Sequence, residues 1–452
     1  MANSLNDTLT QCHEKNSKIE IFGLGYVGFP LAIHLALAGW RVNGVDVNPE
    51  RIQRLEQNNL MESELHLKKE FLECRNNKNL SFSTEPHKNN NSTIGIICVP
   101  TPIPRSGVKS DVFVRSAIEK FLDYCNKGSV LIIESSIEIG TTDEMKKIIK
   151  SKGFIIGENF GLAFCPERID PQNKKWRLEN IPRVIYCSDD ITFNIAQNVY
   201  SNVNNSNLIR VESARVAEVV KSFENTFRLV NISLVNELAI LCDKLGINVT
   251  DVINAAATKP FGFVPFYTGA GAGGHCIPKD PRFLLESSKK FGFTFNSIEK
   301  ALEINSFMPK YIAQSVDKIL TEQNLKKSII VCGLSYKPDM EDMRDSPGFK
   351  IVNEFSKLGF AVVVYDPFFK NELLNKYLYE NNLEKADFHV LTDLDNSALD
   401  NNSCICIVQH HTQTQSRLDE IYKKSLVPVL YDCQNKVIKD PKSKTILKYL
   451  GS

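Results

Sequence analysis

One cysteine follows a segment made mostly of glycine and alanine. Cys276 lies in GAGAGGHCIPKDP, residues 269 to 281, shortly after Gly273 and Gly274. A structural cysteine behaves as a small buried hydrophobe and needs no such setting. A cysteine that attacks a substrate needs access and a neighbouring positive charge. The glycines would let a ligand approach the thiol closely, so the segment fits either a nucleophile or a glycine-rich turn.

Charged residues follow this cysteine directly. Lys279, and Lys221 if it folds nearby, would favour the thiolate, and Asp280 could orient a lysine or a water. His275 suggests a cysteine–histidine dyad, but side chains that are adjacent in sequence rarely face each other. We therefore expect His275 to be a loop residue or a substrate contact.

A second motif, GLGYVG, has the spacing of a dinucleotide fingerprint. Gly23 would make the tight turn, Gly25 would let the backbone approach a pyrophosphate, and Gly28 would let helix and strand pack closely. The motif follows an apolar strand, opens a helix and precedes Asp46 at the distance expected of an acid that binds the ribose 2′-hydroxyl. An acid there favours NAD over NADP, an effect that Arg51 could temper. The simpler alternative is a glycine turn kept for packing.

Three polar residues elsewhere have the types that acid–base and oxyanion chemistry uses. Lys221 and Asn225 stand four residues apart on a predicted helix and so share one face. Glu167 in FCPERIDP follows an apolar segment, and strand-end loops line the ligand crevice of a parallel sheet. A solvated helix face and an ordinary surface charge are the simpler interpretations of the pair and of the glutamate.

Alternating strand and helix patterns must position these residues. From residue 18 to about 205, apolar strands alternate with helical segments, which predicts a parallel sheet covered on both faces. From Val211 an apolar stripe at three- and four-residue steps predicts a long helix within an all-helical section. KSIIVCGLSYK and AVVVYDP then repeat the strand, Gly-Leu, helix, strand and Asp order of the first motif. The repeat lacks the later glycines, so we do not expect it to hold a dinucleotide in the same way.

We therefore predict an α/β protein with two Rossmann-like, doubly wound parallel-sheet domains. An all-helical central region with a long helix joins them, and the predicted boundaries are 1–205, 206–322 and 323–452. The apolar stripe runs along the long helix from Val216 to Leu234. It predicts a homodimer in which these helices pair, unless the stripe is buried within one chain.

The composition limits the remaining classes of function. The 452 residues carry a formal net charge of +1, which argues against the basic face of a nucleic-acid-binding protein. The first eighteen residues are polar and no run of about 18 apolar residues occurs, so neither a signal peptide nor a membrane span is predicted. The twelve cysteines are scattered, as expected of a reduced, cytoplasmic protein. No metal is predicted either, because the nearest approach to a zinc site lacks a second cysteine pair: Cys404, Cys406, His410 and His411.

Seven motifs, taken in order, resemble the UDP-glucose/GDP-mannose dehydrogenase family over about residues 18 to 440: GLGYVGFPLA, VPTP, ESSIEIGTT, CPERIDP, VVKSFENTFRLVNISLVNELA, GAGGHCIPKDP and GLSYKPDMEDMRDSP. The resemblance implies oxidation of the C6 alcohol of a nucleotide sugar to a carboxylate, with two NAD and no metal. It also implies that the three domains, in order, bind NAD, form the dimer with part of the catalytic site, and bind the UDP-sugar.

The resemblance assigns roles to individual residues. Cys276 would trap the C6 aldehyde as a thiohemiacetal, which a second hydride transfer turns into a thioester. Glu167 would assist hydrolysis of the thioester, and the residues implied to handle oxyanions and water are Lys221, Asn225, Asp280 and Ser136. The implied NAD contacts are Gly23, Gly25, Tyr26, Val27, Gly28, Asp46, Arg51, Thr101, Ser136 and Arg344. The implied substrate contacts are Glu167, Arg168, Lys221, Asn225, Phe266, Tyr267, Gly273 and Lys337.

Residues 257 to 281 bear on the identity of the sugar. ATKPFGFVPFYTGAGAGGHCIPKDP is similar to the branch that acts on UDP-N-acetylglucosamine for surface polysaccharides. This chain departs from the usual pattern at four positions: Ser136, Gln172, Thr268 and Ala270. We expect UDP-N-acetylglucosamine as substrate, with UDP-glucose and UDP-N-acetylmannosamine as alternatives. Two further hypotheses are a two-electron β-hydroxyacid-type dehydrogenase and a non-enzymatic protein that binds NAD or a nucleotide sugar.

Overall fold

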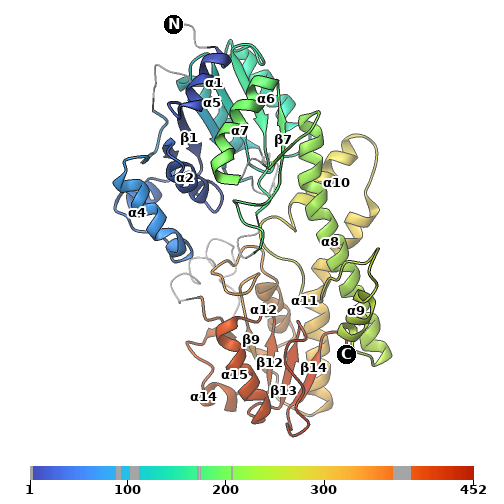
Figure 1. The fold of residues 1–452 in the computed structure, drawn as a ribbon. Helices are drawn as coiled ribbons and strands as arrows, with labels where there is room; N and C mark the ends of the chain where they lie inside the picture. The colour runs from blue at the N-terminus through green and yellow to red at the C-terminus, as the bar shows by residue number, and fades with distance from the viewer. Residues whose placement is uncertain are drawn as a thin grey trace. The chain divides into compact units, whose positions relative to one another are not determined.

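The chain divides into two compact units, Met1–Phe223 and Glu224–Ser452, whose elements are labelled in Figure 1. The structure is a computed structural model and describes residues 4–87, 93–101, 111–169, 173, 175–204, 207–369 and 388–452. Among these residues no helix combines the length and the apolar character needed to span a membrane.

An eight-stranded sheet in the order β3-β2-β1-β4-β5-β6-β7-β8 forms the centre of the first unit. Its strands are β1 Lys18–Phe22, β2 Arg41–Val45, β3 Leu80–Ser83, β4 Thr93–Ile97, β5 Ser129–Ile133, β6 Phe160–Phe164, β7 Arg183–Cys187 and β8 Leu208–Arg210. The predicted parallel sheet is confirmed for β1 to β6, but β7 runs antiparallel to β6, which the sequence pattern did not predict. The start of β7 therefore lies at the edge where β1 to β6 end.

Helices cover both faces of this sheet, because alternate strand residues feed two separate cores. Ile94 and Ile96 pack into one core, and Ile97 into the other. The helices α1, α2, α4 and α7 contribute to the first core, and α5 and α6 to the second. The helices of the unit are α1 Leu5–His13, α2 Gly28–Leu37, α3 Pro49–Glu56, the 3-10 helix η1 Glu62–Leu67, α4 Lys68–Asn76, α5 Val112–Tyr124, α6 Thr141–Ser151 and α7 Asp190–Asn204. The predicted doubly wound fold is confirmed.

The second unit contains a six-stranded parallel sheet in the order β11-β10-β9-β12-β13-β14. Its strands are β9 Ser328–Cys332, β10 Ala361–Tyr365, β11 Phe388–Val390, β12 Cys404–Ile407, β13 Val429–Asp432 and β14 Ile446–Tyr449, and the helices between them are α12 Pro347–Lys357, α14 Asn396–Asp400 and α15 Thr412–Lys423. Two cores again lie on opposite faces, with α12 in one and α14 and α15 in the other. The second predicted Rossmann-like domain is confirmed.

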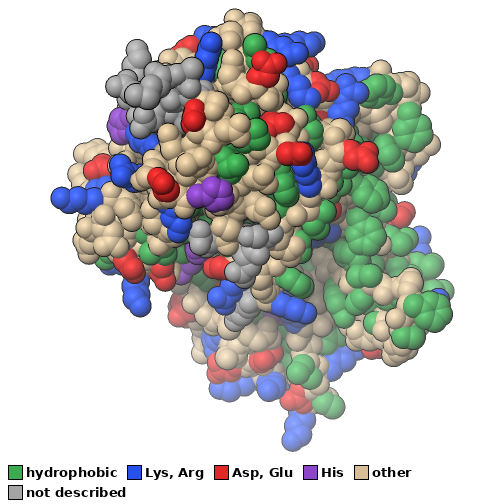
Figure 2. All heavy atoms as spheres, turned by 45° about the horizontal axis from the view of Figure 1, so that its top comes forward, with side chains coloured by type: hydrophobic (Ala, Val, Ile, Leu, Met, Phe, Trp, Pro, Cys, Tyr) green, Lys and Arg blue, Asp and Glu red, His purple; other side chains and the backbone are tan. Residues whose placement is uncertain are grey.

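The predicted helical region is also confirmed. It consists of α8 Ala214–Leu245, α9 Val249–Ala257, α10 Asp280–Lys290 and α11 Asn296–Glu322. Ala239 and Cys242 of α8 pack into the core of the second unit. The apolar stripe that predicted α8 is largely exposed, with Phe223 at 56% and Leu234 at 61% relative accessibility. Figure 2 shows hydrophobic side chains gathered on the side of the molecule where Figure 1 places α8 and α9.

Candidate active site

The glycine fingerprint forms the turn between β1 and α2. Gly23 has φ +90°, and a Cβ on Gly28 would lie 2.0 Å from the carbonyl oxygen of Gly23. Gly28 is therefore required for the start of α2 to pack against the turn. A Cβ on Gly25 would meet nothing within 4 Å, so the outer face of the turn is bare backbone at the N-terminus of a helix. This cradle fits the pyrophosphate of a dinucleotide. Tyr26 beside it is exposed and Val27 half-buried.

Asp46 and Arg51 both hold the residue that follows the first glycine. The two carboxylate oxygens of Asp46 accept N–H groups from Leu24 at 2.9 Å and Asn48 at 3.0 Å. Arg51 is buried; its Nε donates to the carbonyl of Leu24 at 3.2 Å, and its two terminal nitrogens pair with Glu64 at 2.9 and 2.5 Å. The charge of Arg51 is thus balanced by a carboxylate, which leaves Asp46 as the group with spare acceptor capacity for a ribose hydroxyl.

The carboxyl ends of β4, β5 and β6 carry the next group of predicted residues. Thr101 is buried and Ser136 is half-buried. The neighbouring Ser135 hydroxyl donates to the carbonyls of Ile97 and Val99, at 3.2 and 2.7 Å. Ser135 thereby joins two strand ends and holds the segment that presents Ser136.

Glu167 lies just beyond β6 and is held at several points. Its Oε1 accepts the N–H groups of Arg168 and Ile169, both at 2.5 Å, and its backbone carbonyl accepts a hydrogen bond from Nζ of Lys221. Arg168 donates to the carbonyl of Pro182 at 2.7 Å. The predicted residues Glu167 and Lys221 are therefore in contact, with Oε2 of Glu167 directed elsewhere.

Cys276 differs from every other cysteine in this chain. All twelve lie within the described residues, and it alone is exposed. Burial raises the pKa of Cys12 to about 11 and that of Cys165 to about 12, so these thiols remain protonated at neutral pH. The carbonyl of Cys276 accepts the N–H groups of Lys279 at 3.1 Å and Asp280 at 2.9 Å. These bonds fix the cysteine in the turn that enters α10.

The glycines before Cys276 serve a purpose that the sequence interpretation missed. A Cβ on Gly273 would lie 2.8 Å from Cβ of Tyr336, and one on Gly274 would lie 2.6 Å from the Tyr336 ring. The N–H of Gly274 donates to the carbonyl of Arg344 at 2.9 Å. The space beside the glycines is thus filled by the loop after β9, rather than left clear for a ligand as we had inferred. Backbone contact between the two loops fixes the approach to Cys276.

Asp280 and Asn225 form a buried pair. Asp280 is fully buried, and its Oδ2 accepts a hydrogen bond from Nδ2 of Asn225 at 2.6 Å. Oδ1 has no hydrogen-bond partner among the described residues and lies 3.6 Å from Nζ of Lys279. Buried polar atoms are normally satisfied, so an orphaned carboxylate oxygen marks a place for a water or a substrate hydroxyl. The predicted grouping of these two residues is seen in the structure.

The remaining predicted contacts of the second unit lie on loops. Arg344 is exposed and pairs through two nitrogens with Asp342, and Lys337 is half-buried. The ring of Phe266 packs edge-on against Phe227 at 5.8 Å between centroids, and Tyr267 is exposed. Gln172, which departs from the usual pattern, lies outside the described residues.

A buried charge cluster that was not predicted from the sequence lies at the carboxyl edge of the first sheet. Arg183 is fully buried, with Nη2 2.7 Å from Oε2 of Glu134 and 3.4 Å from Oε2 of Glu167. The hydroxyl of Tyr200 donates to Glu134, and the guanidinium lies 4.6 Å from the centroid of the Tyr200 ring. The available signal was a charged residue opening the apolar strand RVIYC, because a buried charge needs a partner.

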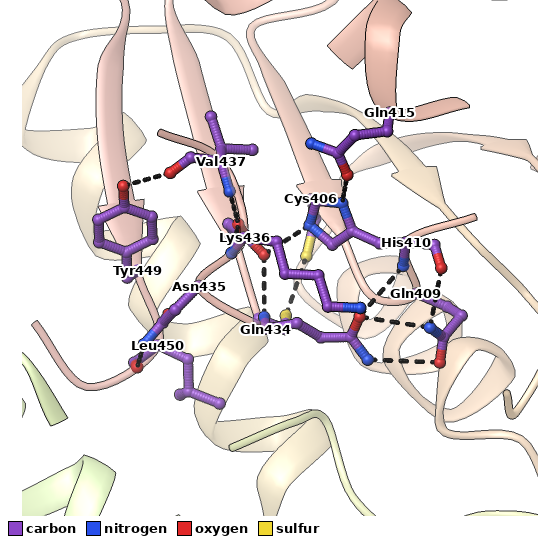
Figure 3. Close-up of polar contacts among 12 residues, drawn as sticks. Cys406, Gln409, His410, Gln415, Gln434, Asn435, Lys436, Val437, Tyr449 and Leu450 are labelled. Atoms are coloured by element: carbon purple, nitrogen blue, oxygen red, sulfur yellow. Dashed lines mark hydrogen bonds and ion pairs between the residues drawn. The ribbon is translucent and has the colours of Figure 1, made fainter. Parts of the chain in front are cut away.

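The two histidines considered for zinc contact carboxylates: His411 lies 3.2 Å from Asp366, and His410 is drawn in Figure 3. His410 contacts Asp432 at 2.9 Å and Gln415 at 2.8 Å. Cys404 and Cys406 are buried in β12. Within the part of the chain that the structure describes, no three His, Cys, Asp or Glu side chains are grouped so as to hold a metal ion.

Three family models match consecutive parts of the chain. They are the NAD binding domain of the UDP-glucose/GDP-mannose dehydrogenase family at residues 17–204, its central domain at 215–307 and its UDP binding domain at 330–439.

Relatives with assigned activities match over most of their length. A UDP-N-acetyl-D-mannosamine dehydrogenase of Methanococcus aeolicus is 33% identical over 94% of this chain and 91% of that protein. A UDP-N-acetyl-D-glucosamine 6-dehydrogenase of Salmonella typhi is 33% identical over 77% of this chain and 82% of that protein. The solved structure of the Pyrococcus horikoshii UDP-D-ManNAc dehydrogenase has a TM-score of 0.82 at 30% identity, over 96% of this chain and 99% of that one. This chain therefore belongs to the UDP-glucose/GDP-mannose dehydrogenase family and is an NAD-dependent nucleotide-sugar dehydrogenase.

Proposed function

We propose that this enzyme oxidises the C6 hydroxyl of a UDP-N-acetylhexosamine to the carboxylate, through a covalent intermediate on Cys276. The observation that carries the proposal is the exposed thiol of Cys276. The backbone carbonyl of the same residue accepts a hydrogen bond from the N–H of the buried Asp280. The fingerprint turn and Asp46 would hold NAD, which when bound accepts the hydride that leaves C6. The loop after β9, with Lys337, would hold the UDP moiety.

A cysteine solves a specific problem in this oxidation. Hydride leaves readily from a carbon that bears an alkoxide, but an aldehyde has no such oxyanion until a nucleophile adds to it. The thiolate of Cys276 forms the C–S bond, and the carbonyl electron pair moves onto oxygen. Loss of a second hydride then gives the thioester. Lys221, with one of its three N–H donors on the carbonyl of Glu167, and Asn225 supply donors for these oxyanions.

Hydrolysis releases the product. Water adds to the thioester carbon, its proton passes to the carboxylate of Glu167, and the C–S bond breaks to return the thiolate of Cys276. The orphaned Oδ1 of Asp280 is suited to hold that water. The sum is one alcohol, two NAD and one water converted to one carboxylate, two NADH and three protons.

Stoichiometry tests the four-electron reaction. NADH formed per UDP-sugar consumed should be two, and a value of one would reject the proposal. Cys276→Ala should abolish turnover, whereas Cys125→Ala, at a half-buried cysteine outside the proposed site, should leave it unchanged. An unchanged rate in Cys276→Ala would favour a two-electron β-hydroxyacid-type reaction. Binding of UDP-sugar with no NADH formed would favour a non-enzymatic role.

Two observations support an N-acetyl group at C2 of the sugar, and they favour different configurations at that carbon. Residues 257–281 resemble the N-acetylglucosamine branch, while two of the three relatives reported above are UDP-N-acetyl-D-mannosamine dehydrogenases. We propose UDP-N-acetylglucosamine first and UDP-N-acetylmannosamine second, with the product entering surface polysaccharide synthesis. NADH production with each of these, UDP-glucose, UDP-GalNAc and GDP-mannose decides between them. Equal or higher kcat/KM with UDP-glucose would reject the N-acetyl assignment.

We further propose a homodimer that buries the exposed apolar stripe of α8. The exposed members of this stripe are Val216, Val219, Phe223, Phe227 and Leu234, each at least 37% accessible. A cluster of this kind is costly to leave in water. Sedimentation at micromolar concentration should show a dimer, and Leu234→Glu should shift it toward monomer. A monomeric wild-type protein would contradict this proposal.

A further inference from the structure

The charge cluster around Arg183 has no role in the function proposed so far. Arg183 and Glu134 are both buried, and Tyr200 closes the cluster with a hydroxyl on Glu134 and a ring against the guanidinium. Burial of an ion pair costs desolvation energy, and apolar side chains of similar volume often replace one without loss of stability. Stability alone therefore does not account for three ionisable side chains at this place.

The antiparallel direction of β7 explains how Arg183 reaches the carboxyl edge. Parallel strands end there, with Glu134 directly after β5 and Glu167 three residues after β6. Because β7 pairs antiparallel to β6, its first residue, Arg183, lies at that same edge. A parallel strand would have placed its first residue at the opposite edge of the sheet.

The two carboxylate oxygens of Glu167 have different surroundings. Oε1 accepts two backbone N–H groups, from Arg168 and Ile169. Oε2 lies 3.4 Å from Nη2 of Arg183, and that nitrogen is 2.7 Å from Glu134. Oε1 is thus occupied, whereas Oε2 is held loosely by a positive charge that is anchored firmly on its other side. Oε2 is the oxygen that remains available to take a proton.

Charged and titratable groups from several elements surround this carboxylate. They are Arg183 from β7, Glu134 after β5, Cys98 after β4, Cys165 after β6, Tyr200 from α7 and Lys221 from α8. Burial raises the pKa of Glu134, against the lowering effect of Arg183. Burial also raises the pKa of Tyr200 well above its usual value. Arg183 is the one cation that the ion pairs place on the side chain of Glu167, within the described residues.

We propose that Arg183 is a positioning residue for thioester hydrolysis: anchored by Glu134 and Tyr200, it holds Oε2 of Glu167 in the orientation that receives the proton of the attacking water. The inference rests on the proposed function, because it assigns Glu167 to hydrolysis. Arginine is suited to the task, since Nη2 contacts both carboxylates while the planar guanidinium packs against the ring of Tyr200, an arrangement that the point charge of lysine does not reproduce.

The test removes the cation together with its anchor. Arg183→Met alone would leave the buried Glu134 without its cation and endanger folding. We therefore pair Arg183→Met with Glu134→Gln, and use Glu134→Gln alone as the background. Arg183→Lys keeps the charge and loses the planar guanidinium. Arg210→Met is the matched control, because Arg210 lies on the neighbouring strand β8 and pairs with the exposed Asp190.

Three measurements locate the affected step. In the paired variant the NADH burst of the first turnover should persist, steady-state kcat should fall by about tenfold or more with KM little changed, and mass spectrometry should show sugar attached at Cys276. Arg183→Lys should accumulate less adduct than the paired variant, and Arg210→Met none. Adding Glu167→Gln to the paired variant should slow hydrolysis no further than Glu167→Gln alone, because Arg183 acts through Glu167.

The outcomes distinguish a failure of the Arg183 role from a failure of the proposed hydrolysis by Glu167. A paired variant with wild-type turnover, one that slows without adduct, or one whose effect adds to that of Glu167→Gln overturns the role of Arg183. If the paired variant does not fold, Arg183→Lys decides: adduct at Cys276 supports the role, and wild-type turnover without adduct overturns it. Absence of adduct in Glu167→Gln itself would reject the proposed hydrolysis step instead.

Discussion

The two Rossmann-like sheets begin with the same turn and use it differently. Gly23 follows β1 with φ +90°, and Gly333 follows β9 with φ +91°. In each unit the residue after the glycine donates its N–H to the aspartate that ends the neighbouring strand, Asp46 at 2.9 Å in the first and Asp366 at 2.7 Å in the second. The internal repeat predicted from the sequence is therefore real in three dimensions.

The two aspartates differ in what else they hold. Asp46 is half-buried and accepts one further described backbone N–H, from Asn48. Asp366 is buried, and its other donors are the N–H and hydroxyl of Ser335, the N–H of Phe368 and Nε2 of His411. A carboxylate offers about four lone-pair sites. Asp366 is thus saturated by its own domain, while Asp46 retains capacity for a ligand.

The helices after the two turns also differ. α2 starts at Gly28, five residues after the turn glycine, and α12 starts at Pro347 after a loop. Gly348 near the start of α12 packs less tightly than Gly28, since its Cβ would lie 3.0 Å from the carbonyl oxygen of Gly333. At the positions of the later motif glycines, Gly25 and Gly28, the second copy has Ser335 and Pro338, as the sequence indicated. The loop between β9 and α12 contains Arg344, whose carbonyl accepts the N–H of Gly274 near Cys276. In the second copy, this region therefore supports the cysteine loop instead of forming a dinucleotide cradle.

The largest predicted contrast is between the two packing glycines. Gly28→Ala places a methyl 2.0 Å from a carbonyl oxygen and should cost about 3 kcal/mol, whereas Gly348→Ala, at 3.0 Å, should cost about 1 kcal/mol. Urea unfolding of both variants measures the difference. Equal losses of unfolding free energy in the two variants would show that α2 and α12 pack equally tightly against their turns.

The next effect concerns the saturated aspartate. Asp366→Asn turns an acceptor for several donors into a group that donates, and should destabilise the protein by about 2 kcal/mol. Thermal denaturation of the variant is the measurement. NAD affinity of the folded variant should stay at the wild-type value, and a weakened affinity would contradict a purely structural role.

The same change in the first unit should act on the ligand. Asp46→Asn keeps an acceptor for the N–H of Leu24 but removes the charge that favours a ribose hydroxyl. We expect about tenfold weaker NAD binding, equal to about 1.4 kcal/mol, measured by calorimetric titration. Unchanged NAD affinity would remove Asp46 from the cofactor site.

Most of the fold could be predicted because its signals are local. The GLGYVG turn, the apolar strands and the α8 stripe each lie within a short window whose periodicity reports burial. The antiparallel β7 could not be predicted, since its direction is set by pairing with the preceding strand β6, which local periodicity does not report. The family motifs brought Asn225 and Asp280 into one group before the structure did.

Two features of the site were beyond the sequence for the same reason. Tyr336 fills the space beside Gly273 and Gly274 from a segment about 60 residues away, so local reasoning assigned that space to a ligand. The partners of Arg183 come from separate strand ends, and only the closed sheet brings them together. Contacts between side chains that are far apart in the chain do not produce a periodic pattern in the sequence, so they could not be predicted from it.

The smallest predicted effect is on acid stability, and it follows from the same contrast. Burial acts to raise the pKa of Asp366, but hydrogen bonds from His411, Phe368 and Ser335 outweigh it and hold the pKa below its usual value. The folded state then binds a proton less readily than the unfolded state. The carboxylate of Asp366 therefore contributes fully to the free energy of unfolding above the pKa of aspartate in the unfolded chain, about 3.9. This contribution is lost as the pH falls below that value. The stability gap between wild type and Asp366→Asn should therefore narrow from about pH 5 to about pH 3. If the free energies of unfolding of wild type and Asp366→Asn changed in parallel with pH, the charge of the buried Asp366 carboxylate would not stabilise the second turn.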